Sequence, residues 1–183
     1  MEPEKGQLIT LMAGVSIAKA IELQTGLSPR VKWPNDVLIN DNKVAGILLE
    51  AEVSRARIGY AVIGFGINVN NDRADLPEDI KVNASSIRME LKKPVDRGAL
   101  VIEIFSELEK LYHRFQCGDF SVILEQWRHY SSTLGQRVRI WQEDKATEGH
   151  AFDLTENGGL VVKLEEGKQI VFHAGDVEYL RIL

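Results

Sequence analysis

The sequence predicts an α/β domain followed by a small SH3-like β-barrel. Residues 8–23 have high helix propensity, residues 97–116 repeat apolar side chains at helical spacing, and extended apolar segments lie between them. Beyond Gly135 the pattern changes from helical to alternating, and several short strands follow. Short strands at regular spacing are typical of a small barrel.

The first half is expected to contain one helix and then a strand hairpin. The helix over 8–23 should end near Gly26, because glycine readily ends a helix. Residues 30–52 resemble two extended pieces joined by Asp41-Asn42, and these two residue types tolerate left-handed backbone in a turn. Residues 58–70 are predicted to form a buried strand that runs into a loop.

An irregular, charged segment comes next, and two helices follow it. Residues 72–91 are expected to lack regular structure. Asp96 is placed to cap a long helix over 97–116, and Asp119 is placed to cap a second helix over 120–130.

The remaining residues predict the barrel. Asn157-Gly158-Gly159 and Glu165-Glu166-Gly167 are expected to be hairpin turns. We place the domain boundary near 131–134, which gives domains 1–132 and 133–183. The expected strands cover residues 138–141, 149–154, 160–164, 169–172 and 177–182.

Composition excludes some classes of function. The chain has 183 residues, of which 44% are hydrophobic and 27% charged, which is ordinary for a soluble globular protein. The formal net charge of −5 argues against nucleic acid as the main partner. The single cysteine, Cys117, fits a reducing compartment, so we expect a cytoplasmic protein. No signal peptide or long uninterrupted apolar run supports secretion or membrane insertion.

Two segments of the hairpin contain the most specific pattern. Lys32-Trp33-Pro34-Asn35-Asp36 precedes the turn, and Lys43-Val44-Ala45-Gly46-Ile47-Leu48-Leu49-Glu50 follows it. The hairpin would bring Asp36 and Lys43 near the same end of one sheet surface. A glycine inside the return strand often marks a bulge or a place where a ligand lies against the backbone.

These two segments closely resemble the signature of biotin protein ligases, which is KWPND, a short turn, and then K-hydrophobic-AGIL-hydrophobic-E. The resemblance implies a mixed sheet with helices, related to class II aminoacyl-tRNA synthetases, and then an SH3-like domain. It also implies an enzyme that uses ATP and Mg²⁺ to adenylate biotin. The biotin is then transferred to a lysine of a biotin carboxyl carrier protein that belongs to a carboxylase.

The resemblance assigns the catalytic roles to Lys43 and Asp36. Fixed positive charge and positioning dominate catalysis of phosphoryl-centred transfers. Lys43 matches the family lysine that contacts biotin and stabilises charge at the α-phosphate. Asp36 would orient Lys43, hold magnesium, or help the acceptor lysine to lose its proton, and a plain turn-capping role also remains open. The sequence leaves the metal ligands unknown.

The biotin pocket is expected to lie along the glycines. Gly46, Ile47 and Leu48 would form one wall, although the last two are plain core residues without the motif. A biotin slot needs mostly apolar walls and a few backbone hydrogen bonds. Gly64 and Gly66 belong to a second segment that resembles the family's G-x-G-I-N element and would let the backbone approach the ligand.

The resemblance assigns ATP binding to four residues. Lys32 is a second cation near the nucleotide phosphates, and Asn35 and Asn68 offer amides. Trp33 is expected either to stack on the nucleotide or to be a half-buried strand residue. The four histidines have no metal-ligand spacing.

One part of the family pattern is not found. Nothing in residues 1–30 matches the family's glycine- and arginine-rich loop of the GRGRxGR type, or its earlier Ser/Thr segment. By the resemblance, this chain corresponds to the last two-thirds of a minimal enzyme. We therefore expect impaired or no adenylation by the chain alone. We also expect a homo-oligomer, or a complex with a separate N-terminal half.

Two alternative functions remain open. A lipoate or octanoyl ligase relative shares the fold but is expected to lack the AGIL run. A non-catalytic remnant of the fold would only bind a ligand or a partner.

Overall fold

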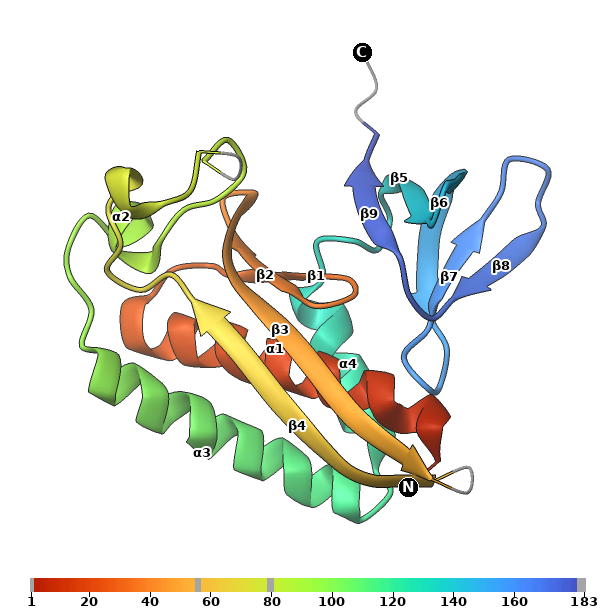
Figure 1. Cartoon of the computed structure of the whole chain (residues 1–183), viewed down its shortest axis with the longest axis horizontal. Helices are drawn as coiled ribbons and strands as arrows, with labels where there is room; N and C mark the ends of the chain where they lie inside the picture. The colour runs from red at the N-terminus through yellow and green to blue at the C-terminus, as the bar shows by residue number, and fades with distance from the viewer. Residues whose placement is uncertain (1, 55–56, 79–80, 181–183) are drawn as a thin grey trace.

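The computed structural model describes residues 2–54, 57–78 and 81–180. A four-stranded sheet packs on a layer of helices, and a second sheet of five strands stands at one end of this layer (Figure 1). The helices are η1 (Pro3–Lys5), α1 (Gly6–Thr25), η2 (Arg73–Asp75), α2 (Ile87–Leu91), α3 (Arg97–Gln116) and α4 (Phe120–Tyr130). The strands are β1 (Arg30–Lys32), β2 (Asp36–Ile39), β3 (Asn42–Ser54), β4 (Arg57–Ile67), β5 (Arg137–Gln142), β6 (Lys145–Leu154), β7 (Leu160–Lys163), β8 (Gln169–Phe172) and β9 (Asp176–Tyr179).

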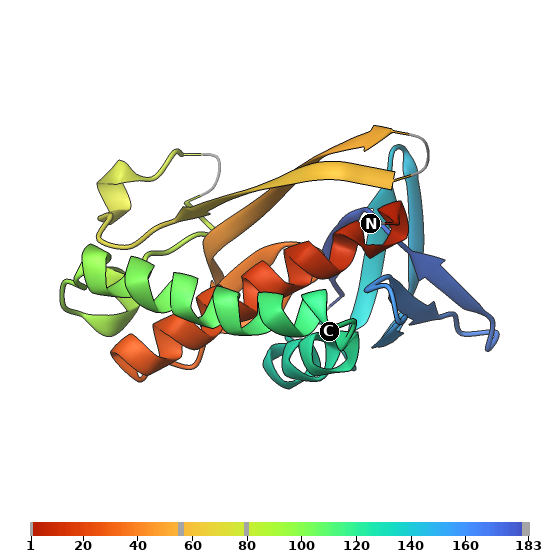
Figure 2. The ribbon, with the colours of Figure 1, turned by 90° about the horizontal axis from the view of Figure 1, so that it is seen from below.

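The first sheet is antiparallel throughout, with the order β1-β2-β3-β4. Its inner face, which includes Ile47 and Phe65, packs on the hydrophobic core. Its outer face has no layer of helices over it (Figure 2). On this outer face Leu48, Tyr60 and Val62 are 62%, 60% and 53% exposed. One face of the sheet is therefore open.

Helix α1 is the centre of the core. It lies against the sheet and contacts both α3 and α4, so nearly all of its circumference is covered (Figure 2). The stretch Pro3–Thr25 is long and apolar enough to cross a membrane by composition, but 78% of its most apolar window is buried in this fold. A helix that is hydrophobic all round is the expected result of such central burial.

The three long helices confirm the predicted helices, and one predicted cap is wrong. Gly26 ends α1 in the left-handed region at φ 72°. The Asp96 side chain accepts hydrogen bonds from the first amides of α3. Asp119 occupies the N-cap position of α4 but makes no capping hydrogen bond. Its carboxylate instead accepts a hydrogen bond from Ser121 and pairs with Arg114.

Two local predictions need correction. The left-handed residues of the first hairpin turn are Asn40 and Asp41, at φ 50° and 64°, so the turn lies one residue earlier than expected. The segment 72–91 was expected to be irregular, but it contains η2 and α2. Ser86 caps α2 by accepting a hydrogen bond from the Met89 amide at 3.1 Å. Residues 79–80 of this segment lie outside the described residues.

The C-terminal domain is a five-stranded antiparallel sheet with the order β8-β7-β6-β5-β9, of the SH3-like type that the sequence predicts. Both predicted glycine turns are present, with Gly158 at φ 85° and Gly167 at φ 86°. The last strand ends at Tyr179, whereas the prediction extended it to residue 182. Residues 181–183 are not among the described residues.

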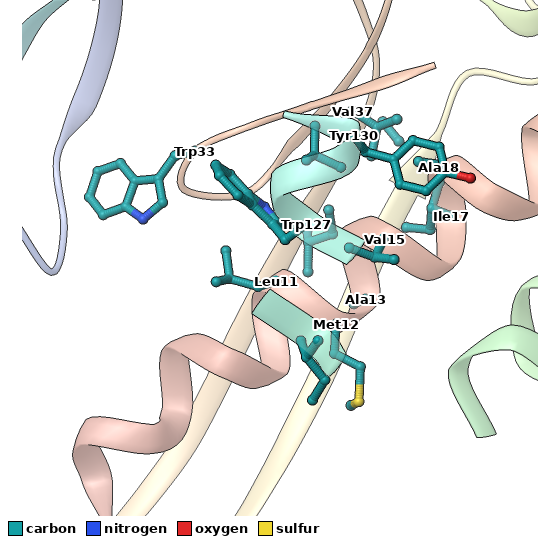
Figure 3. Close-up of a cluster of buried hydrophobic side chains, with 14 of the residues drawn as sticks. Leu11, Met12, Ala13, Val15, Ile17, Ala18, Trp33, Val37, Trp127 and Tyr130 are labelled. Atoms are coloured by element: carbon teal, nitrogen blue, oxygen red, sulfur yellow. The ribbon is translucent and has the colours of Figure 1, made fainter. Parts of the chain in front are cut away.

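Trp33 joins the first sheet to the second. Its side chain is fully buried, and its indole Nε1 donates a hydrogen bond to the Gly158 carbonyl of the barrel at 3.1 Å. Its backbone amide donates to Thr133 Oγ1 at 3.0 Å. Figure 3 shows Trp33 at the margin of the core cluster that contains Leu11 and Trp127. The barrel is thereby fixed to the strand bend that follows β1.

A buried carboxylate links α1 to α3. The Glu107 side chain is 3% exposed, and it pairs with Lys19 at 2.7 Å and with Lys110 at 2.5 Å. Burial acts to raise the pKa of Glu107, but the hydrogen bonds from Lys110 and Lys19 outweigh it and the pKa lies below its ordinary value. A lowered carboxyl pKa means that the ionised form stabilises the fold.

We expect Glu107→Gln to lower the free energy of unfolding by about 1–3 kcal/mol at pH 7, because it removes the charge from a hydrogen-bonded buried pair. The stabilisation is fully present above the unfolded-state pKa of about 4.3 and is lost as the pH falls through the lower folded-state value. Urea unfolding at pH 7 and near pH 3 measures this. Glu109→Gln, on the exposed side of α3, is the control. An equal loss at both pH values would contradict the assignment.

Candidate active site

Lys43 and Asp36 form an ion pair on the open face of the sheet. Lys43 Nζ lies 2.5 Å from Asp36 Oδ1, and the two side chains are 48% and 21% exposed. The lysine therefore remains accessible to a ligand, while the carboxylate beneath it is mostly covered. This arrangement agrees with the expectation that the hairpin brings the two residues to one surface.

A β-bulge places Lys43 on that face. Asp36 pairs with Gly46 and Val37 with Ala45, but Leu38 then pairs with Lys43, so Val44 is an extra residue in β3. Residues three apart in a regular strand point to opposite faces, and one extra residue reverses this alternation. Lys43 and Gly46 consequently share the face of Asp36.

The backbone of Lys43 is held on both sides. On one side it pairs with Leu38 of β2. On the other side its amide donates to the Asn83 carbonyl at 2.8 Å, and its carbonyl accepts from the Ser85 amide at 2.9 Å. The Asn68 side chain donates to the Ser85 carbonyl at 3.1 Å and so supports the same segment. Sequence reasoning did not find this contact, because nothing local pairs 83–85 with the start of β3.

Gly46 makes room for the lysine side chain. A Cβ atom at Gly46 would lie 3.1 Å from Lys43 Cε and 3.2 Å from Lys43 Nζ, closer than ordinary van der Waals contact. Gly66 lies directly opposite on β4 and would meet nothing within 4 Å, and Gly64 faces Leu48. The three glycines leave a bare backbone floor beside the ammonium group, as expected for a surface that a ligand approaches closely.

Lys32 is a second cation on the same face, because it pairs directly with Asp36 across β1 and β2. Its Nζ lies 5.0 Å from the centre of the Tyr179 ring in the barrel. Burial lowers the pKa of Lys32, and the attraction of Asp36 opposes this effect. The pair Lys43–Asp36 and the partly covered Lys32 form one charged cluster.

The three other residues expected at the nucleotide have structural contacts. Trp33 is enclosed by protein, so no ring face is open to a stacked base. Asn35 Nδ2 donates to the Ile47 carbonyl at 2.8 Å, and the Asn35 carbonyl accepts from the Ile47 amide at 2.9 Å. Asn68 donates to Ser85. These contacts show how the three residues support the surface around Lys43.

The expected biotin wall divides between the two faces of the sheet. Ile47 is 3% exposed and points into the core, whereas Leu48 is 62% exposed on the open face. Alternation along β3 causes this difference. The open face therefore presents Leu48 with Gly46, Gly64 and Gly66, while Ile47 fixes the strand from below.

An open groove of about 950 Å³ lies between the sheet and the barrel. Pro34, Asn35 and Leu48 line one side, and Trp141 and Asp176 are among the residues of the other. Neither Lys43 nor Asp36 lines this groove, so the charged cluster lies outside it on the sheet surface. In the part of the chain that the structure describes, no three His, Cys, Asp or Glu side chains gather around a common point.

Comparison with known proteins gives two family matches. Residues 2–68 match the "Biotin/lipoate A/B protein ligase family", and residues 133–180 match "Biotin protein ligase C terminal domain". The chain is similar to the bifunctional ligase/repressor BirA of Bacillus spizizenii, with 31% identity over 96% of this chain and 54% of that protein. It is also similar to a biotin–[acetyl-CoA-carboxylase] ligase of Mycobacterium tuberculosis, with 30% identity over 94% of this chain and 62% of that protein.

The fold is similar to that of a solved ligase. The biotin protein ligase of Aquifex aeolicus superposes with a TM-score of 0.81 at 26% identity, covering all of this chain and 79% of that one. The same enzyme in complex with biotin and ATP also gives 0.81 at 26% identity, with all of this chain and 76% of that chain covered. The chain spans about half the length of the BirA relative that it matches.

We expect Gly46→Ala to displace the Lys43 side chain, because the new methyl group would lie too close to its last two atoms. Crystal structures of the variant and of the unmodified protein should differ in the position of the Lys43 side chain, with a longer distance from Lys43 Nζ to Asp36 Oδ1 in the variant. Gly59→Ala on β4 is the control, since its Cβ would have its nearest neighbour at 3.9 Å. An unchanged ion pair in the Gly46 variant would show that the glycine does not accommodate the lysine.

Proposed function

Because this chain belongs to the biotin protein ligase family, we propose that it catalyses the ATP-dependent adenylation of biotin and its transfer to a carrier-protein lysine. The observation that supports this most is the Lys43–Asp36 pair beside a bare glycine floor on the open face of the sheet. An accessible ammonium beside exposed backbone suits a ligand that combines a carboxylate with a ring system. We propose the cytoplasm as the site of this chemistry.

In the proposed first step, a carboxylate oxygen of biotin attacks the α-phosphorus of ATP. The new oxygen–phosphorus bond forms as the bond to the β-phosphate bridge breaks, and pyrophosphate leaves. Negative charge increases on the α-phosphoryl oxygens, and the Lys43 ammonium is placed to stabilise it. Because its backbone is held from both sides, the lysine needs little reorganisation at the moment of reaction.

In the proposed second step, the amine of the acceptor lysine attacks the carbonyl carbon of the biotinyl group. The carbon–nitrogen bond forms, the bond to the phosphate oxygen breaks, and AMP leaves with its electron pair. The amine loses one proton during this step, and solvent water takes it up. The contact of Asp36 with Lys43 favours an orienting role for this carboxylate over direct proton transfer.

The substrates are proposed to lie along the open face. Leu48, Gly46, Gly64 and Gly66 would bind biotin, with Lys43 at its carboxylate. Lys32 pairs with Asp36 on the side away from Gly46, and it would contact the nucleotide phosphates there. Asn35, Asn68 and Trp33 would act through the backbone that they support, since their polar groups already have protein partners.

Magnesium is proposed to enter together with ATP. Mg²⁺ usually takes one or two protein carboxylates and completes its coordination with phosphate oxygens and water. Asp36 is the carboxylate of the charged cluster, and it is 21% exposed. When bound, the ion would neutralise charge on the departing pyrophosphate.

Isothermal calorimetry with biotinyl-5′-AMP tests this function most directly. Tight binding would support the ligase, and no binding to a well-folded protein would favour a non-catalytic remnant of the fold. Lipoyl-5′-AMP distinguishes the lipoate alternative, which the first family match also includes. We expect biotinyl-5′-AMP to bind more tightly, because the AGIL run is intact and the relative of 30% identity is a biotin–[acetyl-CoA-carboxylase] ligase.

We expect Lys43→Ala to reduce adenylation by about 10²- to 10³-fold, the usual effect of losing one transition-state donor. The assay measures pyrophosphate release after the N-terminal segment of a related ligase is supplied by fusion or as a second chain. The fold should be unaffected because the side chain is 48% exposed. Lys43→Arg should not restore the full rate, since a planar guanidinium does not replace a compact ammonium. Glu52→Ala, which is exposed on the same strand, is the control. Near-normal turnover of Lys43→Ala would make Lys43 an ordinary surface lysine.

Besides the carrier protein, we propose a second partner, which would bind at strand β4. Strand β4 pairs with β3, and no other described strand pairs with it. Exposed Tyr60 and Val62 lie on the open face of the same strand. Free strand edges and apolar patches favour association. We therefore propose that a second copy, or a separately encoded N-terminal half, covers β4.

Light scattering should detect this association, either for the protein alone or after an N-terminal ligase fragment is added. Val62→Lys should weaken it, because the change puts a charge at a covered apolar position. Phe152→Lys is the control, since Phe152 is 60% exposed on the barrel and lies on a different sheet. A monodisperse monomer that binds no fragment would exclude the proposal.

A further inference from the structure

Tyr179 lies at the end of β9, where the barrel meets the first sheet. Its ring centre is 5.0 Å from Lys32 Nζ, within the distance of a cation–π contact. Its hydroxyl lies 2.9 Å from Ser132 Oγ and 3.4 Å from Thr133 Oγ1. Burial raises the pKa of Tyr179, so its hydroxyl stays protonated. The Tyr179 side chain is therefore contacted at its ring face by Lys32 and at its hydroxyl by Ser132 and Thr133.

The same two hydroxyl residues hold the strand on both sides of Lys32. Ser132 donates to the Val31 carbonyl from its amide at 2.9 Å and from its hydroxyl at 3.1 Å. Thr133 Oγ1 accepts from the Trp33 amide at 3.0 Å. The segment 132–133 thus fixes the lysine backbone and the tyrosine ring together, so their relative position does not depend on the long lysine side chain alone.

The Lys32 ammonium has no nearer fixed partner among the described residues. It forms no ion pair within 4.0 Å in that part of the chain, although Asp36, Asp176 and Glu178 attract it and Lys43 repels it. A free lysine in this field would move among the three carboxylates. The aromatic face therefore selects one position, next to the Asp36–Lys43 pair.

We propose that Tyr179 is a positioning residue of the ligase site, whose ring fixes the Lys32 ammonium beside the Asp36–Lys43 pair. This inference rests on the proposed function, because Lys32 matters only if phosphates bind there. By this inference, the Tyr179 side chain of the barrel determines the position of the Lys32 ammonium. The barrel then contributes to the site without touching the substrate.

Nuclear magnetic resonance of lysine side chains, labelled at Cε and Nζ in the full chain, tests the placement. A methylene group above an aromatic ring is shifted by the ring current, and Lys32→Arg identifies the Lys32 signal. We expect Tyr179→Leu to abolish this shift. Tyr179→Phe should retain it, because the ring remains although the hydroxyl contacts are lost. Phe152→Leu, an exposed barrel aromatic, should leave it unchanged. Thermal unfolding of each variant checks that the barrel remains folded.

Calorimetry with biotinyl-5′-AMP on the same proteins tests the role. We expect about 3- to 10-fold weaker binding for Tyr179→Leu and near-normal binding for Tyr179→Phe, even though the latter loses the hydroxyl contacts. If Tyr179 had a purely structural role, each variant would bind biotinyl-5′-AMP more weakly in proportion to its loss of stability. An unchanged Lys32 signal in Tyr179→Leu, or unchanged affinity despite a lost signal, overturns the inference. If the unmodified chain shows the Lys32 shift but binds no biotinyl-5′-AMP, the proposed function itself fails.

Discussion

The bulge at Val44 is the constraint on which the site depends. Without it, the strand alternation that makes Ile47 a core residue would turn Lys43 away from Asp36 and toward the helices. A charged lysine could not be buried there at acceptable cost. The extra residue resolves the conflict, because it keeps the apolar face continuous and still places an ammonium on the open face. The glycine three residues later then leaves the space that the side chain occupies.

The surroundings of the bulge make this placement rigid. Segment 83–85 continues the hydrogen bonding of β3 where β4 has ended, and Asn68 supports that segment. On the other side, Asn35 occupies both backbone groups of Ile47. Polar residues that resemble ligand-binding groups in the sequence thus stabilise the strand irregularities. The exposed Lys43 side chain is therefore the group that remains accessible to a substrate.

One joint between the first sheet and the barrel lies next to the charged cluster. Trp33 donates a hydrogen bond into a barrel turn, while segment 132–133 bonds to the backbone on both sides of Lys32. Gly158 must be a glycine at this joint, because a Cβ there would lie 2.9 Å from Leu11 of α1 in addition to its left-handed backbone. These contacts fix the barrel to the residues that flank Lys32.

The sequence by itself determined the helices, the hairpins, the SH3-like domain and the family signature, because these depend on local propensity and on residue order. It also determined that Asp36 and Lys43 would lie on neighbouring paired strands, since a short turn joins these strands. Only the tertiary structure decided which face Lys43 occupies, that Trp33 is a joint between domains, and that Tyr179 lies over Lys32. A bulge shifts the alternation of side chains without a unique local signal. Contacts between residues 100 or more positions apart depend on how two separate sheets pack, which is a property of the whole core.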